Sequence, residues 1–295
     1  MMLLKSRSND IVATLRLLAA ANCSPAHRVP QARLPGWYVF RHRFLATLSL
    51  ALVLSVSACA PPTSPEVVQA TVTLYFSDGQ AQHVIPEQRT VDLGGMSQPE
   101  AVIRALLSGA EDPFLLRPLP EATALNSIEV RDGIALVDLS GAARVEGSAA
   151  ESIALRAIVY TLTELAGIER VQLLIEGRLN DSIGGHEVLD APLARGGILT
   201  WPILLDHDRI AWLQQEVDAG RQAWRRDPLA VARFDGRMAG FLGTESMENI
   251  TAGGDATVRY RTEYGGQGYQ LSLEQPARTG VDGIWVLVAV DAVDP

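Results

Sequence analysis

The chain has 295 residues, of which 47% are hydrophobic and 20% are charged, and its formal net charge is −9. The charge is uneven, because the first 59 residues contain 7 basic and 1 acidic side chain, which leaves 18 basic and 33 acidic side chains for residues 60–295. A surface that binds nucleic acid needs clustered Lys and Arg against the phosphates, so this acidic body argues against a nucleic-acid partner.

Both cysteines of the chain, Cys23 and Cys59, precede the part that is predicted to fold. Residues 60–295 therefore contain neither a disulfide framework nor a thiolate metal site. They are long enough for one large domain or two ordinary domains, each with its own core.

An export signal is predicted near the N-terminus. The segment Phe44–Ala58 is apolar and uncharged, and it follows Arg41 and Arg43. It is shorter than the ~20 residues that a helix needs to span the bilayer core. A basic start, a short apolar run and small residues before a break are typical of a secretory signal.

The end of this signal, Val56-Ser57-Ala58-Cys59, resembles a bacterial lipobox. The sulfur of Cys59 would take a diacylglyceryl group, and cleavage between Ala58 and Cys59 would then free an amine for a further acyl chain. Two or more chains give stable membrane anchoring. We therefore predict a lipoprotein that is held at the extracytoplasmic face of the cell membrane through Cys59; the alternative is an ordinary cleaved signal with an incidental cysteine.

Residues 1–38 fit no signal pattern, whereas a chain that starts at Val39 would have a conventional signal. We interpret residues 1–38 as the product of a misplaced start codon and treat 1–59 as the signal region. The predicted fold therefore does not include residues 1–59.

Residues 60–70 form a Pro- and Ser-rich tether, and a first domain is predicted over 71–196. Thr71–Phe76 alternates as a half-buried strand in which Tyr75 lies on the more exposed face. His83–Val91 is predicted to return as a second strand.

A capping box of Ser97 and Glu100 then starts a helix that Gly109 ends. Further along, Asp132-Gly133 is the strongest hairpin signal in the chain.

A second capping box, of Ser148 and Glu151, starts a helix with one apolar stripe that Gly167 closes. The apolar segment Val171–Gly177 follows as a buried strand. The order β-β-α-β-β-α-β predicts a small twisted sheet with both helices on one face.

These segments resemble the GerMN domain family, the sporulation and germination module of Gram-positive lipoproteins. The resemblance rests on TVTLYFSDG, VIPEQRTV, EAVIRALLSG, NSIEVRDGIALVDLS and the long stretch from Gly147 to Arg195 that contains TLTELAGI and GGH. It implies an extracytoplasmic binding or scaffolding module that is not an enzyme, and it transfers no catalytic residues.

A connector over 197–205 leads to a second predicted domain over 206–295. A helix is expected from Asp206 to Trp224, and a second helix starts at Asp227 with Pro228 at its first position. The apolar stripe of that second helix continues past a glycine to Leu242, and three strands over 257–263, 269–273 and 284–290 complete an antiparallel meander. The fold class is α+β, with two domains that each contain a small mixed or antiparallel sheet and helices packed on one face.

Few side chains suggest a catalytic, metal-binding or modification site. Asp206-His207-Asp208 is the one His between carboxylates, and we interpret it as a solvated helix start rather than a metal site. We assign His186, in Gly184-Gly185-His186, a structural role at a bend. Asn249-Ile250-Thr251 fits a glycosylation sequon, which is incidental in a bacterial lipoprotein. We predict no catalytic residue, no metal and no cofactor.

The aromatic residues allow two interpretations. Trp201, Trp212, Trp224 and Trp285 all belong to the connector and the second domain. Core filling is favoured because their spacing matches helix and strand interiors; a surface cluster would instead form a platform for a partner or a glycan.

The predicted function is a non-catalytic binding or scaffolding role in the cell envelope, toward an unknown envelope protein and with a link to sporulation or germination. The alternative is a lipoprotein that presents a small molecule or cell-wall fragment to a transporter or enzyme, from a pocket between the domains lined by the Trp residues. An envelope hydrolase is the weakest hypothesis, because nothing pairs a nucleophile with a base.

Overall fold

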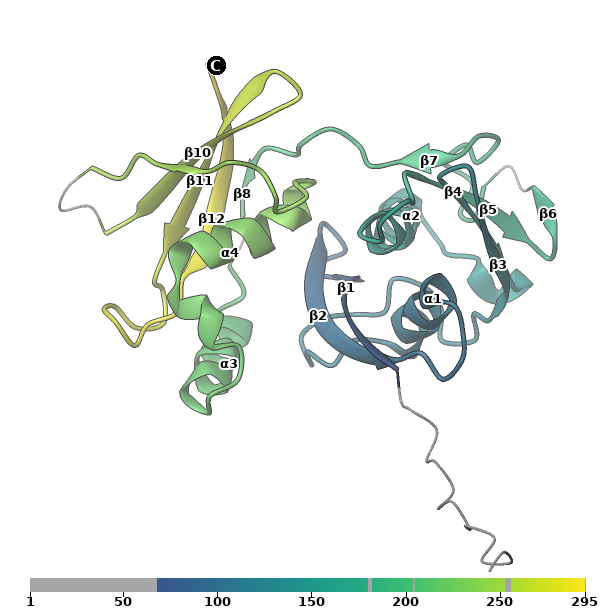
Figure 1. The fold of residues 1–295 in the computed structure, drawn as a ribbon, viewed down its shortest axis with the longest axis horizontal. Coiled ribbons are helices and arrows are strands. Elements are labelled where there is room, and N and C mark those ends of the chain that lie inside the picture. Colours follow the sequence, from purple (N-terminus) through teal and green to yellow (C-terminus); the bar gives the residue numbers. More distant parts are fainter. Residues whose placement is uncertain (1–67, 180–181, 204, 253–255, 295) are drawn as a thin grey trace, which may run out of the picture. The chain divides into compact units, whose positions relative to one another are not determined.

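The structure is a computed structural model that describes residues 68–179, 182–203, 205–252 and 256–294. The described residues belong to one compact unit, drawn as a ribbon in Figure 1. The predicted signal region, including Ala58 and Cys59, lies outside the described residues.

The first lobe comprises the elements from β1 to β7. Its strands and helices are β1 (Gln69–Ser77), β2 (Val84–Asp92), α1 (Gln98–Ser108), β3 (Leu125–Arg131), β4 (Ile134–Leu139), α2 (Ser148–Thr163), β5 (Arg170–Ile175), β6 (Arg178–Leu179) and β7 (Leu193–Ala194). From β1 to β5 the order β-β-α-β-β-α-β is the predicted one, the short strands β6 and β7 are additional, and the α+β class is confirmed.

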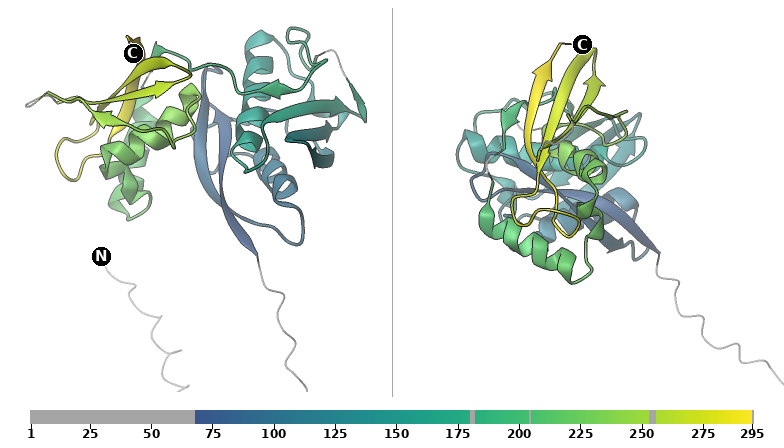
Figure 2. Two further views of the ribbon diagram at one scale, coloured as in Figure 1. Left: turned by 45° about the horizontal axis from the view of Figure 1, so that its top comes forward. Right: turned by 90° about the vertical axis from the view of Figure 1, so that its left-hand side faces the viewer.

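The strands of the first lobe form two sheets, so the prediction of a single sheet is wrong. β1 and β2 form a two-stranded antiparallel sheet, from Gln69–Asp92 to Ser77–Val84, and Ser77 makes one further bridge to Leu116. The other sheet has the order β3-β4-β5-β6, with β4 and β5 parallel and β7 paired to β5. Helices α1 and α2 contact strands of both sheets and lie between them (Figures 1 and 2).

The burial of α2 explains this arrangement. The six consecutive residues Ala157–Leu162 are all buried, so the helix is covered on every side rather than along the predicted single stripe. A helix that is buried all round needs a partner on each side. The hairpin β1-β2 supplies one side and the sheet of β3, β4 and β5 supplies the other.

Strand β1 is buried on both faces toward its C-terminal end. Leu74, Tyr75 and Phe76 are all fully buried, so the predicted half-buried alternation with Tyr75 on the exposed face is wrong. The Tyr75 backbone N–H donates to Thr161 Oγ1 of α2 at 3.1 Å. A helix side chain thus satisfies a strand donor that would otherwise be buried without a partner.

The predicted cap of α1 is confirmed in part. The Ser97 side chain accepts a hydrogen bond from the Glu100 N–H at 3.4 Å, and Gly109 ends the helix with φ of 95°. The reciprocal half of the capping box is not formed, because the Glu100 carboxylate pairs with Arg104 one turn further along the helix.

The predicted capping box of α2 is wrong. Gly147 is the N-cap residue, and neither it nor Ser148 makes a side-chain cap. Glu151 is fully buried, and its carboxylate accepts hydrogen bonds from the loop at residues 182–187 instead. The helix ends at Thr163, before Gly167, which is left-handed with φ of 85° in the following turn.

The hairpin between β3 and β4 is confirmed. Asp132 and Gly133 have φ of 51° and 75°, which gives the two left-handed residues of a type I′ turn. This turn matches the right-handed twist of the strands that it connects.

Replacing Gly133 by alanine should lower the free energy of unfolding by about 1–2 kcal/mol, the cost of a left-handed residue with a Cβ atom. A Cβ at this position meets the Glu169 side chain at ordinary contact distances, so the cost is conformational rather than steric. Urea unfolding would measure it. Gly79→Ala is the control, because its Cβ meets no atom within 4 Å and its φ is not left-handed. Equal effects of both changes would contradict this explanation.

The second lobe comprises the elements from β8 to β12. They are β8 (Trp201–Pro202), α3 (His207–Asp218), the 3-10 turn η2 (Ala223–Arg226), α4 (Pro228–Asp235), the 3-10 turn η3 (Gly236–Ala239), β9 (Glu248–Asn249), β10 (Val258–Tyr264), β11 (Gln267–Glu274) and β12 (Val286–Val293). The sheet has the order β8-β12-β11-β10-β9, and every pair is antiparallel. The predicted meander is β10-β11-β12.

Three details of this lobe differ from the predictions. Residues 201–202 of the predicted connector pair with β12 as an edge strand. The helix that follows ends at Asp218 rather than Trp224, since Gly220 is left-handed. The apolar stripe predicted to continue from the helix at Asp227 to Leu242 is interrupted, because Gly236 starts a separate 3-10 turn. Leu242 at the end of this stripe is exposed.

Each lobe has its own buried apolar cluster. That of the first lobe is formed by β1, β2, both helices and the sheet of β3, β4 and β5. In the second lobe, α4 and η3 pack on the sheet, and α3 makes a smaller cluster with Ile284. Within the described ranges, no helix has the length and apolarity needed to cross a membrane.

Candidate functional site

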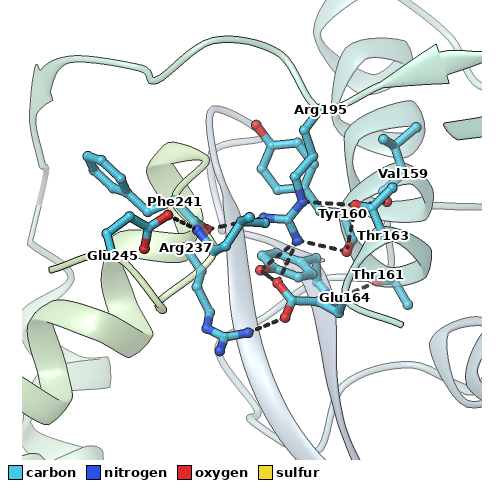
Figure 3. A network of polar contacts seen from close by, with 11 residues as sticks. Val159, Tyr160, Thr161, Thr163, Glu164, Arg195, Arg237, Phe241 and Glu245 are labelled. Atoms are coloured by element: carbon cyan, nitrogen blue, oxygen red, sulfur yellow. Dashed lines mark hydrogen bonds and ion pairs between the residues drawn. The ribbon is translucent and has the colours of Figure 1, made fainter. Parts of the chain in front are cut away.

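A carboxylate that follows α2 joins the two lobes (Figure 3). Glu164 Oε1 accepts hydrogen bonds from the Tyr75 hydroxyl at 2.6 Å and from Arg195 Nη2 at 2.5 Å, while Oε2 pairs with Arg237 Nη1. Tyr75 lies in β1, Arg195 follows β7, and Arg237 belongs to η3 of the second lobe. We call these four residues the joint.

Arg195 is the most extensively bonded residue of the joint. Its Nε donates to Thr163 Oγ1 at 2.8 Å, Nη2 donates to the Tyr160 carbonyl at 3.0 Å, and Nη1 donates to the Phe241 carbonyl of the second lobe at 3.2 Å. The guanidinium also lies 4.6 Å from the centre of the Tyr160 ring. Charge-assisted hydrogen bonds and cation–π contacts are strongest where water is excluded, so these contacts hold the lobes together.

The environment of Tyr75 keeps its hydroxyl protonated. Burial raises the pKa of Tyr75 well above its ordinary value, and this effect outweighs the neighbouring Arg195, which acts to lower it. A protonated phenol can donate to Glu164, whereas a phenolate could not. The Tyr75 hydroxyl, the Glu164 carboxylate and the Arg195 guanidinium of the joint all have hydrogen-bond partners, whereas Arg237 Nε is buried without one. Paired buried groups of this kind suit a structural connection.

A cleft opens elsewhere between the lobes, with a volume of about 670 Å³. Its walls come from β2 and the loop after α1 on one side, and from α3, η2 and α4 on the other. Its lining residues include Glu87, Gln88, Glu111 and Asp112 of the first lobe and Arg209, Trp212, Glu216, Arg221, Gln222, Trp224, Arg225 and Phe234 of the second lobe. We call it the Trp cleft. Its volume lies within the range of ~300–1,000 Å³ that is usual for small-ligand sites.

Two aromatic pairs lie at the Trp cleft. Trp212 packs against Phe114 of the first lobe with 6.1 Å between ring centres, and Trp224 packs edge-on against Phe234 at 4.8 Å. The Arg225 guanidinium lies 4.5 Å from the centre of the Trp224 ring. All four aromatic side chains are partly exposed, so they are held in place and still offer surface to a ligand.

An ion pair between the two lobes lies in the wall of the Trp cleft. Asp112 is buried, and its Oδ2 accepts from Arg209 Nε at 2.8 Å while Oδ1 accepts from the Phe114 N–H at 2.9 Å. Asp112 belongs to the first lobe and Arg209 to α3, so this pair is a second connection between the lobes.

Replacing Arg209 by glutamine should lower the free energy of unfolding by about 2–3 kcal/mol, because a buried carboxylate loses its charged partner. The double variant with Asp112→Asn should be less destabilised than the sum of the two single variants, since neither charge is then left unpaired. A double-mutant cycle by urea unfolding measures this coupling. Additive effects would show that the pair contributes nothing.

A smaller cavity of about 180 Å³ adjoins the Trp cleft. The two share Pro86, Leu115, Arg209, Leu213 and Arg225 in their walls. The rest of the smaller cavity is mostly apolar, and its polar wall includes the Asp78–His83 pair in the loop between β1 and β2. Burial raises the pKa of Asp78, but hydrogen bonds, first that from His83, outweigh this effect and lower it.

The carboxylates around His207 do not converge. Asp206 is the N-cap of α3 and accepts from the Arg209 N–H at 3.0 Å, as the helix-start interpretation predicted. Among the described residues, no group of three or more His, Cys, Asp or Glu side chains could hold a metal ion.

The bend at His186 wraps around Glu151. The His186 N–H donates to Glu151 Oε2 at 2.8 Å, and half of the His186 side chain is exposed. A Cβ on Gly184 would lie 2.9 Å from Glu151 Oε2, so only glycine lets the loop approach the carboxylate this closely. This position fits the structural role that we assigned to His186.

The tryptophans combine the two predicted roles, core filling and a surface for a ligand or partner. Trp285 packs against the second core with part of its surface exposed. Trp212 and Trp224 pack against apolar clusters and also line the Trp cleft. The strand that contains Trp201 is described only by its backbone pairing with β12.

No pattern in the sequence predicts the joint or the Asp112–Arg209 pair. Glu164 lies 31 residues from Arg195 and 73 from Arg237, and 97 residues separate Asp112 from Arg209. One signal could have indicated such pairs: a single charged residue within or beside an apolar segment, such as Glu164 after Leu162, needs a partner if the segment is buried.

The geometry defines an α+β protein with two lobes, a joint between them and a cleft. Residues 73–181 match the family model Germane, which is described as sporulation and spore germination. The first lobe is thus a GerMN-like domain, as the resemblance of its sequence indicated. The match covers well under half of the 295 residues and does not extend into the second lobe.

Three solved structures are similar to part of this chain. A Clostridium perfringens protein described as a lipoprotein is 27% identical, over 44% of this chain and 88% of that chain, with a TM-score of 0.33. The tandem GerMN domains of the sporulation protein GerM from Bacillus subtilis are 22% identical, over 44% and 46%, with a TM-score of 0.37. The first GerMN domain of the same protein is 21% identical, over 43% and 98%, with a TM-score of 0.34. No curated protein matches the sequence.

Proposed function

We propose that the protein is a non-catalytic binding lipoprotein of the cell envelope, anchored through Cys59 at the extracytoplasmic face of the membrane, and that it positions an envelope protein partner. The joint carries this proposal. Its charge-assisted contacts connect the GerMN-like domain to the second lobe, so the two lobes present their surfaces in a fixed relation. A fixed relation between two surfaces is what a scaffolding module needs.

The description of the family supports a role in sporulation or germination if the host forms spores, and a general envelope role if it does not. The roles of Asp112, Glu151 and Glu164 support a non-catalytic function. Each of these carboxylates accepts hydrogen bonds from fixed donors, which suits structure better than proton transfer.

The anchoring can be tested at Cys59. Cells fed labelled palmitate should produce a labelled protein in the membrane fraction, and Cys59→Ser should lose both the label and the membrane association because the acylated sulfur is absent. Globomycin should block processing of the wild-type precursor. An unlabelled, soluble secreted wild-type protein would contradict the anchor.

The partner can be tested by crosslinking and affinity purification from membranes. Three chains with the same signal region are compared: the full chain, a chain without residues 71–196 and a chain without residues 206–295. We expect a protein captured by the full chain to be lost from at least one truncated chain. A partner list that is unchanged by both truncations would rule out scaffolding by the lobes.

A second candidate function is favoured by the Trp cleft. Its volume of about 670 Å³ and its Trp212 and Trp224 walls match the pocket that the ligand-binding alternative requires. In that case the protein would present a small molecule or a cell-wall fragment to a transporter or enzyme.

A further inference from the structure

The charged side chains of the Trp cleft are engaged in ion pairs, and two of the carboxylates share one arginine. Its walls contain the carboxylates Glu87, Glu111, Asp112 and Glu216 and the guanidinium groups of Arg209, Arg221 and Arg225. Each has a partner of opposite charge within the protein: Glu87 and Glu111 pair with Arg89, Asp112 with Arg209, Glu216 with Arg221, and Arg225 with Asp235. A charged ligand would have to compete with these pairs, and at the buried Asp112 and Arg225 it would leave a buried charge unsatisfied, so the cleft favours an uncharged ligand.

The aromatic walls are fixed before any ligand arrives. Phe114 supports Trp212, and both Phe234 and Arg225 support Trp224. Because ordering a loose aromatic side chain on binding costs free energy, rings that are already held bind a flat ligand face at lower cost. Indole rings also offer a large apolar surface to the C–H groups of such a face.

Polar side chains surround these rings. Gln88 is exposed on β2, and Gln222 accepts a hydrogen bond from Arg225 Nε at 3.1 Å while its amide nitrogen remains a donor. The carboxylates of the ion pairs have further lone pairs. A ligand with hydroxyl and amide groups around its edge can therefore exchange hydrogen bonds with the walls without displacing an ion pair.

We propose that the Trp cleft binds an uncharged oligosaccharide, whose sugar rings combine apolar C–H faces with a hydroxyl edge. This inference deepens the second candidate function and rests on it. The predicted envelope location makes N-acetylated β-1,4-linked glycan the expected source. A peptide is the competing ligand class; its termini and side chains would bring charge into a cleft whose buried charges, Asp112 and Arg225, are already paired.

The test is calorimetric titration of the full-length chain in detergent with the β-1,4-linked tetramer of N-acetylglucosamine. We expect a Kd in the range of about 1 mM to 10 μM. Because no charge is exchanged, the Kd should stay constant as the salt concentration rises, whereas binding of a charged peptide would weaken. Trp212→Ala and Trp224→Ala should each weaken binding about tenfold or more.

Three further variants separate loss of the site from loss of the fold. Trp285→Phe changes a partly exposed tryptophan outside the Trp cleft and should bind like the wild type. Trp224→Phe keeps an aromatic face and should retain most of the affinity. Gln88→Trp adds bulk at an exposed wall without removing a buried group, so it should block binding in a protein that unfolds at the wild-type temperature.

Binding of the tetramer that persists in Trp212→Ala and Gln88→Trp would overturn the proposal. So would the absence of heat at about 10 mM tetramer, or binding of a charged tetrapeptide in its place. Capture of a protein partner from membranes does not depend on the Trp cleft, so failure here and failure of the scaffolding role are distinguishable.

Discussion

Replacing Glu151 by glutamine is expected to lower the free energy of unfolding by about 2–4 kcal/mol, although the two side chains have nearly the same size. Oε1 of the buried Glu151 accepts from the Ser182 hydroxyl and from the N–H groups of Ile183 and Gly184, and Oε2 accepts from those of His186 and Glu187. All these partners are donors. The amide nitrogen of glutamine would face them with donors of its own.

Glu151 also gives a prediction for pH dependence. Burial alone would raise the pKa of Glu151, but the hydrogen bonds from Ser182 and the loop backbone outweigh it and lower the pKa from 4.5 to about 2. A carboxylate with a depressed pKa stabilises the fold above its unfolded pKa, and this contribution is lost as the pH falls through the folded pKa. The stability difference between wild type and Glu151→Gln should therefore be constant above about pH 5 and shrink as the pH falls to about 2.

Urea unfolding at several pH values measures both effects. Glu129→Ala is the matched control, because Glu129 and its partner Arg131 are both mostly exposed and such pairs contribute about 0–1 kcal/mol. A Glu151→Gln protein as stable as this control at neutral pH would show that the loop at 182–187 does not depend on the carboxylate.

Local chemistry was sufficient for turns and several helix starts. The Asp132-Gly133 turn, the Ser97 cap and the Asp227-Pro228 start all lie where the sequence places them. In each case the residues that form the feature are neighbours in the chain, so their identities contain the necessary information.

The same reasoning failed at Ser148 and Glu151, where the spacing is that of a capping box. Two sets of N–H donors could bind the Glu151 carboxylate: those at the start of its own helix and those in a loop more than 30 residues away. The carboxylate binds the loop because the loop supplies several donors in a buried environment, where each hydrogen bond is stronger. No pattern within the helix could reveal this competition.

The burial of the β1-β2 hairpin also could not be predicted from the sequence. Alternation placed Tyr75 on the exposed face, since a tyrosine between apolar residues of a strand is compatible with either side. Its burial depends on Glu164 and Arg195, which supply a partner for the hydroxyl. The joint and the Trp cleft likewise depend on contacts between distant segments. The sequence indicated a Trp-lined pocket between the domains only as an alternative, and it did not indicate which residues of the first lobe would form the opposite wall.

The joint should be the most sensitive connection between the lobes. Replacing Glu164 by alanine is expected to lower the free energy of unfolding by about 3–5 kcal/mol, because the side chains of Arg195 and Arg237 would lose their shared anion. The Arg195 side chain is only 7% exposed, so water cannot replace the lost partner. Two cations would also remain close together with no charge between them.

This change should affect the relation between the lobes as well as total stability. Hydrogen exchange is expected to rise first at η3 and at the end of α4, because the chain meets the first lobe there through Arg237 and the Phe241 carbonyl. The control Glu100→Ala breaks an exposed ion pair within α1 and should cost about 0.3–0.5 kcal/mol. If Glu164→Ala matched that control in urea and in exchange, the lobes would not be held by this carboxylate, and the fixed relation on which the scaffolding role rests would be lost with it.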